Sequence, residues 1–416
     1  AEETWQAPPV RLVCGMFDSW QDFRVYATGL PHLAKPEITG TLALTVNRGN
    51  PVLQPVGHEP VEPLLLRIDE HKKINRQVQI SATFGQSGKP VVFQQEIASG
   101  GLDLPLSKPD ETLSSLEMTF DMPDQSFSVR RQLFVPSLVP VKLNSGWRDN
   151  RPILSADNGP FSIALSPDFS HALMSLCVDG HEWLDTTFPQ PEPRSWFNSW
   201  PGGLSAKPWG LQHATIHAAE RNGAYAQLSD QHGNHWSGLS STYRIEDHPK
   251  FGGLTVTVYW VMLPGIPLLA QVVHVQNRTG RILQNEEMGC ELFFRPQRDL
   301  QQCWFEARDT AGTLRRYRGG QTEHDLTVQQ SVLLGADGIQ QRLQVITRDN
   351  PDGQSPMANN ALIAWMKGLR VTVADQASGW TEPVFFLAST AGVPLDSLGD
   401  LLALELRERE AQHADH

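Results

Sequence analysis

The sequence predicts an all-β protein in which a small antiparallel β-sandwich precedes a larger one. Short apolar and β-branched runs recur along the 416 residues, and Gly, Pro, Asn and Asp separate them. Helical periodicity is scarce, and the 33 Gly and 30 Pro indicate many turns. A domain takes roughly 150 residues, so the chain has room for two or three domains with large cores.

The N-terminal part is expected to form an immunoglobulin-like β-sandwich over residues 1–140. Its apolar runs follow one another at the spacing of such a sandwich. The segment Val135–Pro140 that comes next contains two prolines, as a linker would. We therefore expect the second domain to begin near residue 145. The predicted N-terminal strands are Ile38–Asn47, Glu62–Ile68, Gln77–Phe84, Pro90–Ile97, Ser114–Phe120 and Phe127–Pro136.

Residues 145–395 are expected to form a large antiparallel sandwich of two layers. The pair Asn222-Gly223 predicts a two-residue hairpin between strands His213–Arg221 and Ala224–Asp230. More than ten strands of this length would expose an apolar face in one open sheet, so two packed layers are favoured. The further predicted strands are Trp236–Glu246, Leu254–Leu263, Pro267–Gln276, Leu283–Phe294, Thr327–Leu334, Gln340–Thr347, Gly368–Ala374 and Pro383–Ala388.

A short C-terminal helix over residues 395–412 is the last predicted element. Asp396 and Ser397 suit its start, and we expect the helix to dock as a cap on the sandwich. Its apolar stripe consists of Leu398, Leu401, Leu402 and Leu406.

The charge balance excludes some partner classes. Lys and Arg total 34 against 46 Asp and Glu, and no basic tract is long enough to follow a phosphate backbone. Nucleic acid and anionic membranes are therefore poor partners. Residues Leu254–Val273 carry no charge, but Pro264-Gly265 and Pro267 interrupt them, so two strands and a turn are expected rather than a membrane span.

Cysteine usage and the first residues bear on the compartment. No Cys-x-x-C or Cys/His zinc spacing occurs. Cys290 and Cys303 could form a bridge across a hairpin, although buried free thiols are the commoner state. The chain begins Ala1-Glu2-Glu3-Thr4, as a mature exported protein does after cleavage, and a trimmed chain would begin the same way. The expected location is periplasmic or secreted.

A tryptophan-rich loop is the strongest candidate for ligand contact. Trp196, Trp200 and Trp209 lie around Pro201-Gly202-Gly203, which is expected to be irregular. Indoles beside Asn198 and Lys207 suit a sugar, whose C–H face stacks on an aromatic ring while its hydroxyls form hydrogen bonds. Two alternatives remain: the tryptophans plug one end of the sandwich, or they form a hot spot for a partner protein.

Four histidines, His213, His217, His232 and His235, are candidates for coordinating a metal ion or contacting a substrate. His213 and His217 would share a face on a helix, but the expected hairpin places them on a strand, where four residues span about 13 Å. No shared metal is therefore expected. His232 and His235 lie on a turn and either line a site or face solvent, and His235 is kept as a candidate substrate-binding residue. No cofactor motif occurs, so no cofactor is expected.

Two carboxylates are candidates for general acid and base chemistry. Glu291 lies in Gly289–Phe294, flanked by apolar residues, and would be desolvated if it pointed inward. Glu382 precedes the strongly apolar strand that begins at Pro383. For each, a salt-bridged or exposed structural carboxylate is the commoner outcome.

Several fragments between residues 145 and 395 occur in an order known from one family. They are Asp149-Asn150-Arg151 with Asn158-Gly159-Pro160-Phe161, Pro201-Gly202-Gly203 with Trp209 downstream, Leu254–Asn277, Gly289–Phe294 and Glu382-Pro383. Together they resemble the galactose mutarotase-like supersandwich group, which includes the aldose 1-epimerases. The resemblance implies a β-supersandwich with Arg151 as a sugar-binding cation and Glu382 as a general base. Where the family has two histidines, this chain has Pro201 and Glu291, so the group that protonates the ring oxygen is missing.

Three functions follow as hypotheses. The favoured one is a carbohydrate-binding or glycan-assembly protein that uses the loop Trp196–Trp209 without covalent chemistry. The second is an epimerase-like or lyase-like enzyme with Glu382 as base and Glu291 as acid, which requires both carboxyls within about 10 Å across one cleft. The third is a non-catalytic interaction scaffold for a neighbouring domain or a partner protein.

Overall fold

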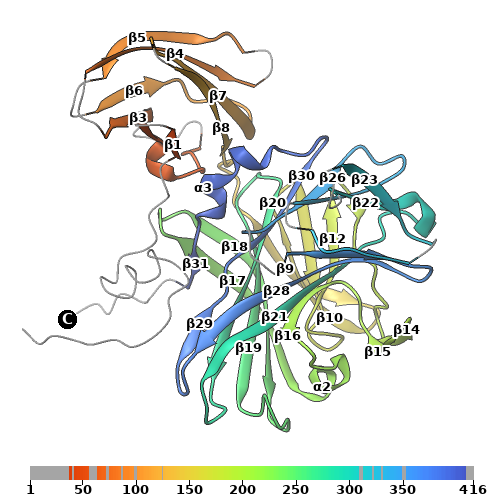
Figure 1. Cartoon of the computed structure of the whole chain (residues 1–416). Helices are drawn as coiled ribbons and strands as arrows, with labels where there is room; N and C mark the ends of the chain where they lie inside the picture. Colours follow the sequence, from red (N-terminus) through yellow and green to blue (C-terminus); the bar gives the residue numbers. More distant parts are fainter. Residues whose placement is uncertain are drawn as a thin grey trace, which may run out of the picture.

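The computed structural model confirms the all-β fold, with antiparallel strands throughout and short helices (Figure 1). The larger part consists of two extended sheets, and a smaller pair of sheets lies at its N-terminal end. The structure describes residues 37–39, 42–55, 63–71, 75–85, 88–97, 101–123, 125–308, 313–320, 323–328, 331–348 and 353–408.

The N-terminal strands form two four-stranded sheets around a core of their own. Strand β3 alternates buried and half-buried residues, which is the period-two pattern of a strand with one face in a core. Strand β6 was not predicted because Asp103 and Pro105 interrupt its apolar pattern. The immunoglobulin-like character of this part stays a prediction. In sheet order the strands are β1 (Glu37–Thr39), β2 (Leu42–Val46), β3 (Leu64–Glu70) and β6 (Leu102–Leu106), then β5 (Val91–Ile97), β4 (Arg76–Phe84), β7 (Leu113–Asp121) and β8 (Ser126–Phe134).

One layer of the larger part is a ten-stranded sheet, whose outer face carries the candidate site described below. Its members come from both halves of the sequence beyond residue 140. In order they are β24 (His324–Asp325), β27 (Ser355–Ala358), β28 (Ile363–Val373), β21 (Leu283–Phe293), β16 (Leu204–Pro208), β12 (Leu173–Val178), β11 (Phe161–Leu165), β10 (Arg151–Asp157) and β9 (Lys142–Arg148), with β13 (His181–Glu182) beside β12.

The other layer is an eleven-stranded sheet in which β17 to β20 are consecutive antiparallel neighbours. The next long strand along the chain, β21, which was predicted as Leu283–Phe294, belongs to the ten-stranded sheet instead. In order the strands are β23 (Leu314–Arg318), β22 (Cys303–Arg308), β25 (Val332–Ala336), β26 (Arg342–Ile346), β30 (Val384–Ser389), β20 (Leu268–Asn277), β19 (Leu254–Met262), β18 (His235–Ile245), β17 (Glu220–Asp230) and β31 (Leu406–Arg407), with β29 (Ser378–Trp380) beside β20.

The main core lies between these two sheets and determines which side chains face outward. Leu204 and Ala206 of β16, with Cys290 and Leu292 of β21, point into this core. Successive side chains on a strand point to opposite faces, so the intervening residues Ser205, Lys207 and Glu291 lie on the outer face of the ten-stranded sheet. Cys290 is a buried free thiol, as is Cys303, and the two do not form a bridge.

The predicted hairpin at Asn222-Gly223 is wrong. Strand β17 runs through both residues and pairs continuously with β18. Gly223 is needed for close packing rather than for a turn, because a Cβ there would lie 2.5 Å from Pro167 Cγ and 3.0 Å from Leu165 Cδ2. The residues before this strand form a short helix, α2 (His213–Ala218), instead of the expected strand.

The C-terminal helix is present but much shorter than residues 395–412. A 3-10 turn, η3 (Leu395–Ser397), precedes α3 (Gly399–Leu402), and Leu406 then pairs with Asp230 at the edge of β17. The predicted stripe is nevertheless apolar and packed: Leu398, Leu401 and Leu406 are buried in a second core that also contains residues of the N-terminal part. Figure 1 shows α3 at this junction. Residues 409–412 lie outside the described residues.

In the part of the chain that the structure describes, no helix is long and apolar enough to cross a membrane. The uncharged stretch Leu254–Val273 forms all of β19 and the first part of β20, joined by a turn, as predicted.

Candidate functional site

The candidate site lies on the outer face of the ten-stranded sheet, over β16, β21 and β28. Two glycines, Gly289 of β21 and Gly368 of β28, are direct partners in the sheet, so the backbone is bare of side chains there. The indole of Trp209 lies against Gly289, where a Cβ would come within 2.6 Å of its Cε3 atom. The carboxylate of Glu287 lies against Gly368, where a Cβ would come within 2.3 Å of its Oε1 atom. An indole and a carboxylate thus rest side by side on the paired glycines.

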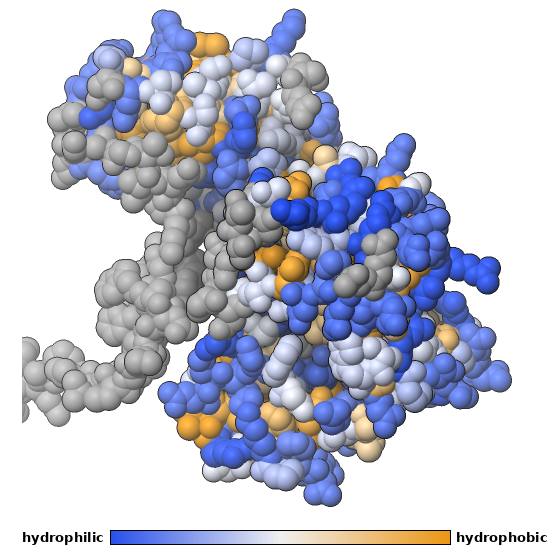
Figure 2. Space-filling model, turned by 45° about the vertical axis from the view of Figure 1, so that its right-hand side comes forward, coloured by the Kyte–Doolittle hydropathy of each residue, from blue (hydrophilic) through white to orange (hydrophobic). Residues whose placement is uncertain are grey.

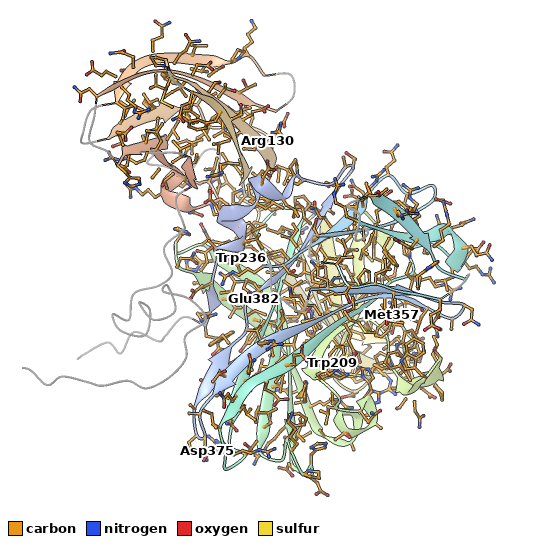
Figure 3. All side chains as sticks on the ribbon, viewed as in Figure 1. Arg130, Trp209, Trp236, Met357, Asp375 and Glu382 are labelled. Atoms are coloured by element: carbon orange, nitrogen blue, oxygen red, sulfur yellow. The ribbon has the colours of Figure 1, made fainter. Side chains whose placement is uncertain are left out.

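Trp209 is held in this position from its backbone. Its N–H donates a hydrogen bond to the Glu287 carbonyl at 2.8 Å. Trp209 is 47% exposed, so part of the indole packs on the sheet at Gly289 while the rest meets solvent. Figure 3 marks its position on the ten-stranded sheet. A flat, partly exposed indole beside a half-buried carboxylate offers both elements of sugar recognition, a stacking surface and a hydrogen-bond acceptor.

Next to Trp209, a buried charged cluster joins β16 and β21 to helix α2. Lys207 Nζ lies 3.0 Å from Glu291 Oε1, and His213 Nε2 lies 3.2 Å from Glu291 Oε2. All three side chains are buried. Burial by itself raises the pKa of Glu291, but the neighbouring His213 and the Lys207 ammonium lower it to about 2. Glu291 is therefore an anion at neutral pH, which suits an ion pair and not the donor of a catalytic proton.

Helix α2 brings His213 and His217 onto one face, because residues four apart on a helix lie above one another. Their ring centroids are 6.4 Å apart, and the ring of His171 lies 5.7 Å from that of His213. The separation of the two histidines expected from an extended strand is thus wrong. Even so, no group of three or more His, Cys, Asp or Glu side chains among the described residues is arranged to hold a metal ion.

Burial keeps the histidines next to this cluster uncharged. It lowers the pKa of His171 well below the usual value, with smaller contributions from the neighbouring histidines. Burial, followed by the Arg221 charge, lowers the pKa of His217 to about 4. His217 Nδ1 lies 3.2 Å from the hydroxyl of Ser199, which ties α2 to the tryptophan loop.

The tryptophan loop is more regular than predicted. Strands β14 (Glu192–Arg194) and β15 (Phe197–Trp200) form a small hairpin with Trp196 at its tip. Trp196 is 56% exposed and Asn198 is also exposed. The Phe197 ring stacks near Trp196, with centroids 5.4 Å apart, and lies 6.0 Å from His213. The hairpin therefore stands beside the charged cluster.

Trp200 is a buried core residue, so it is not available as a ligand contact and instead matches the alternative in which a tryptophan plugs the sandwich. It packs edge-on against Phe293, and the guanidinium of Arg194 covers its ring at 4.2 Å. The cause is the segment that follows: a Cβ at Gly202 would lie 2.1 Å from the Asp185 carbonyl oxygen, and one at Gly203 would lie 2.0 Å from that of Leu173. These close approaches hold the loop against the sheet, and Trp200, which directly precedes the segment, is buried as a result.

Glu382 lies just before β30 of the eleven-stranded sheet, whereas Glu291 lies on β21 of the ten-stranded sheet. Burial raises the pKa of Glu382, and the charges of Arg348 and Lys367 oppose that effect. Lys367 is the partner of Cys290 in the sheet and therefore faces the space between the layers, whereas Glu291 faces outward. The structure does not bring these two carboxyls together in one cleft.

Arg151 and His235 are also apart from the cluster. Arg151 begins β10 and donates to the Asp168 carbonyl at 2.8 Å. His235 begins β18, lies 3.1 Å from the Ser229 hydroxyl, and lines a cavity of about 480 Å³ between the N-terminal part and the large sandwich. Of the predicted site residues, only Lys207, Glu291 and Trp209 meet on the same surface, with Trp196 and Asn198 at its edge.

Sequence reasoning missed Glu287, Gly368 and His171. Gly368 was read as the start of a strand, and nothing in its neighbourhood shows that Gly289 is its partner. The one available signal was the glycine inside the apolar strand that became β21, since glycine in a strand often marks a close approach.

No family model and no curated protein matches this sequence. Solved structures match in fold. The Slr1438 protein from Synechocystis sp. PCC 6803 is 13% identical at a TM-score of 0.39, over 62% of this chain and 100% of that chain. A galactose mutarotase related enzyme from Lactobacillus acidophilus is 11% identical at 0.36, over 56% and 96%. A galactose mutarotase-like protein from Clostridium acetobutylicum is 9% identical at 0.37, over 60% and 98%.

The structures matched thus include galactose mutarotase-like proteins. At such identities and scores they assign no role to any residue. The site is therefore argued from its own geometry.

Proposed function

We propose that the protein binds a carbohydrate on the outer face of the ten-stranded sheet, with Trp209 as the stacking surface and Glu287 as the acceptor for sugar hydroxyls. The observation that carries this proposal is the pair of facing glycines, Gly289 and Gly368, which lets an indole and a carboxylate lie flat and adjacent. A sugar ring presents C–H groups on its face and hydroxyls at its edge, and it matches such a surface with both.

The Lys207–Glu291–His213 cluster supports the site because it holds β16, β21 and helix α2 together next to Trp209. Separating this buried ion pair would leave a buried charge without its partner, so the three side chains are held together. Lys207 lies two residues before Trp209, so this anchor fixes the segment that carries the indole. Trp196 and Asn198 on the β14–β15 hairpin extend the site at its edge.

The charge states favour binding over catalysis. Glu291 is ionised at neutral pH, and Glu382 lies just before β30 of the other sheet. A noncovalent role needs neither residue as a proton donor. The exposed indoles of Trp209 and Trp196 also favour a ligand surface over a scaffold that buries its tryptophans.

A glycan array with the purified chain, followed by calorimetry with the best-bound oligosaccharide, tests this proposal. We expect Trp209→Ala to weaken binding roughly tenfold, since an aromatic stacking contact contributes up to about 1.5 kcal/mol. Glu287→Gln should weaken it less, because the amide retains one acceptor. Trp147→Ala is the matched control: this indole is 78% exposed on β9, away from the site, and its loss should leave binding unchanged.

Two results would refute the proposal. One is unchanged affinity in Trp209→Ala when its urea denaturation curve matches that of the parent. The other is an array on which the parent binds no glycan.

A further inference from the structure

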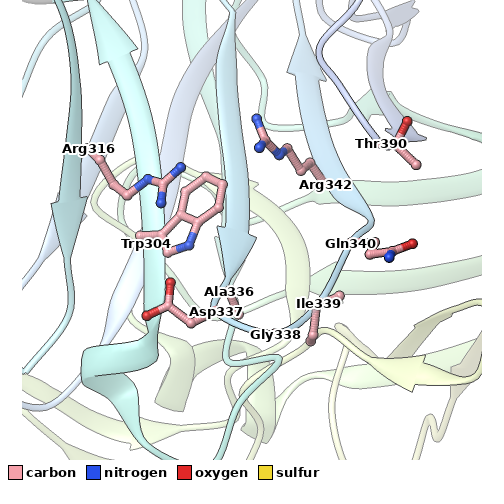
Figure 4. A pocket seen from close by; sticks show the side chains of 9 residues that line it. All are labelled: Trp304, Arg316, Ala336, Asp337, Gly338, Ile339, Gln340, Arg342 and Thr390. Atoms are coloured by element: carbon pink, nitrogen blue, oxygen red, sulfur yellow. The ribbon is translucent and has the colours of Figure 1, made fainter.

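A second cavity opens on the outer face of the eleven-stranded sheet, away from the site proposed above. Its volume is about 400 Å³, within the range of small-molecule sites, and Trp304, Arg316, Asp337, Gln340, Arg342 and Thr390 are among the residues that line it (Figure 4). Figure 2 shows strongly hydrophilic side chains gathered over the part of the sandwich that holds β22, β23 and β26.

The floor of the cavity is rigid. The indole of Trp304 lies flat on the sheet because its neighbour in β25 is Gly335, where a Cβ would come within 2.3 Å of the ring. The Arg316 guanidinium covers the other face, 3.9 Å from the ring centroid, so Trp304 is only 3% exposed. Arg316 is itself held by Glu306, at 3.0 Å from Nε and 2.7 Å from Nη2. The indole is therefore clamped between backbone and guanidinium.

Among the described residues that line this cavity, the guanidinium of Arg342 has N–H donors that no carboxylate accepts within hydrogen-bond distance. Glu306 is bound by Arg316, and Asp337 is bound by both terminal nitrogens of Arg318, at 2.6 and 3.1 Å. The guanidinium of Arg342 lies 3.9 Å from Glu306 and 5.6 Å from the centroid of the Trp304 ring, and it makes no hydrogen bond to any residue that the structure describes. Three arginines against two carboxylates leave a local excess of one positive charge, although the whole chain carries a net charge of −12.

We propose that this cavity binds the carboxylate of an acidic sugar through Arg342. A guanidinium donates two parallel hydrogen bonds to a carboxylate, an arrangement that a hydroxyl cannot reproduce. The Gln340 amide and the Thr390 hydroxyl line the same space and can bond the sugar hydroxyls (Figure 4). The cavity volume accommodates a sugar ring together with its carboxylate.

The test is calorimetry of the full chain with glucuronate, glucose and inorganic phosphate at low ionic strength. We expect glucuronate to bind, and glucose and phosphate each to bind at least tenfold more weakly, because glucose lacks the charge and phosphate lacks the ring. Equal binding of phosphate and glucuronate would overturn the proposal in favour of a simple anion site. Equal binding of glucose, or no binding of glucuronate, would refute the role of Arg342.

Variants assign any binding to this cavity. Arg342→Gln should lose glucuronate affinity by roughly tenfold or more, the scale of a hydrogen bond to a charged group. Arg342→Lys should lose less glucuronate affinity, since lysine keeps the positive charge but cannot donate two parallel hydrogen bonds to the carboxylate. Arg244→Gln, an exposed arginine on β18 that pairs with its neighbour Glu246, is the matched control and should bind normally. Trp209→Ala should also bind glucuronate normally, so this proposal and the proposed function can fail separately.

Discussion

On both outer faces of the large sandwich a tryptophan indole lies on a glycine of the sheet. The two surfaces differ in what covers the indole. On the ten-stranded sheet Trp209 lies over Gly289 with its outer side open, and a charged cluster is buried beside it. On the eleven-stranded sheet Trp304 lies over Gly335, and a guanidinium covers it. The glycine permits the flat indole in both cases. What covers the indole determines the chemistry of the ligand: an open ring suits a sugar face, whereas a covered ring presents cations.

The largest expected effect is a loss of stability in Glu291→Gln, which removes the carboxylate of the buried cluster beside Trp209. This change leaves Lys207 buried without its counter-charge, so we expect a loss of about 3–5 kcal/mol in the free energy of unfolding by urea. The matched control is Glu117→Gln, whose exposed pair with Arg130 should contribute about 0–1 kcal/mol. A loss in Glu291→Gln no larger than the control's would contradict the role given to the buried cluster.

Adding a methyl group under each indole tests the comparison directly. Gly335→Ala forces a Cβ against a ring that cannot move, and we expect a loss of about 1–3 kcal/mol in urea denaturation. Gly289→Ala meets a ring that is free on its outer side, so Trp209 should tilt away with a smaller loss of stability and weaker glycan binding. The reverse order of the two stability losses would show that Trp209 is the more tightly held ring.

As pH falls, the groups beside Trp209 on the ten-stranded sheet should lower the free energy of unfolding in two steps. The pKa of His217 is lowered to about 4 in the folded chain, so the stability tied to its neutral form is complete above about pH 6.5 and is lost as pH falls toward 4. The pKa of Glu291 is lowered to about 2, so its contribution is lost below its ordinary pKa as pH falls toward 2. We expect His217→Gln to make the upper step shallower in denaturation midpoints measured from pH 8 to 4, and His171, whose pKa is also lowered, to account for part of the slope that remains. An unchanged slope in that variant would contradict the assignment.

Trp196→Ala is expected to have the smallest effect. The indole is exposed at the tip of the β14–β15 hairpin, so its removal should change the unfolding free energy by less than about 0.5 kcal/mol. Glycan affinity measured by calorimetry should fall by about twofold to threefold if the hairpin extends the site. An effect equal to that of Trp209→Ala would move the centre of the site to the hairpin.

Most strands could be predicted because their local pattern agrees with their environment. Strands β18, β19 and β20 lie within two residues of their predicted bounds, since apolar alternation and clear turn residues mark both ends. The error at Asn222-Gly223 has a different origin. A local turn signal was overruled by packing against Pro167 and Leu165, which the sequence does not display.

The site was predictable only in pieces. Lys207, Glu291 and Trp209 were each singled out, but their meeting depends on the pairing of β16 with β21, which are far apart in the sequence. The fate of Trp200 depended on close backbone approaches that only the fold creates. The second cavity has a sequence signal, because Leu314–Arg318 holds three arginines in five residues of an acidic chain.

Trp209 and Trp304 should belong to two sites with different ligands, and one NMR titration tests this. The twelve tryptophans each give an indole N–H signal, and Trp209→Phe and Trp304→Phe identify the two of interest. A neutral oligosaccharide found on the array should shift the Trp209 signal and leave that of Trp304 in place, and glucuronate should do the opposite. Movement of both signals with either ligand, or of neither with both, would contradict the account.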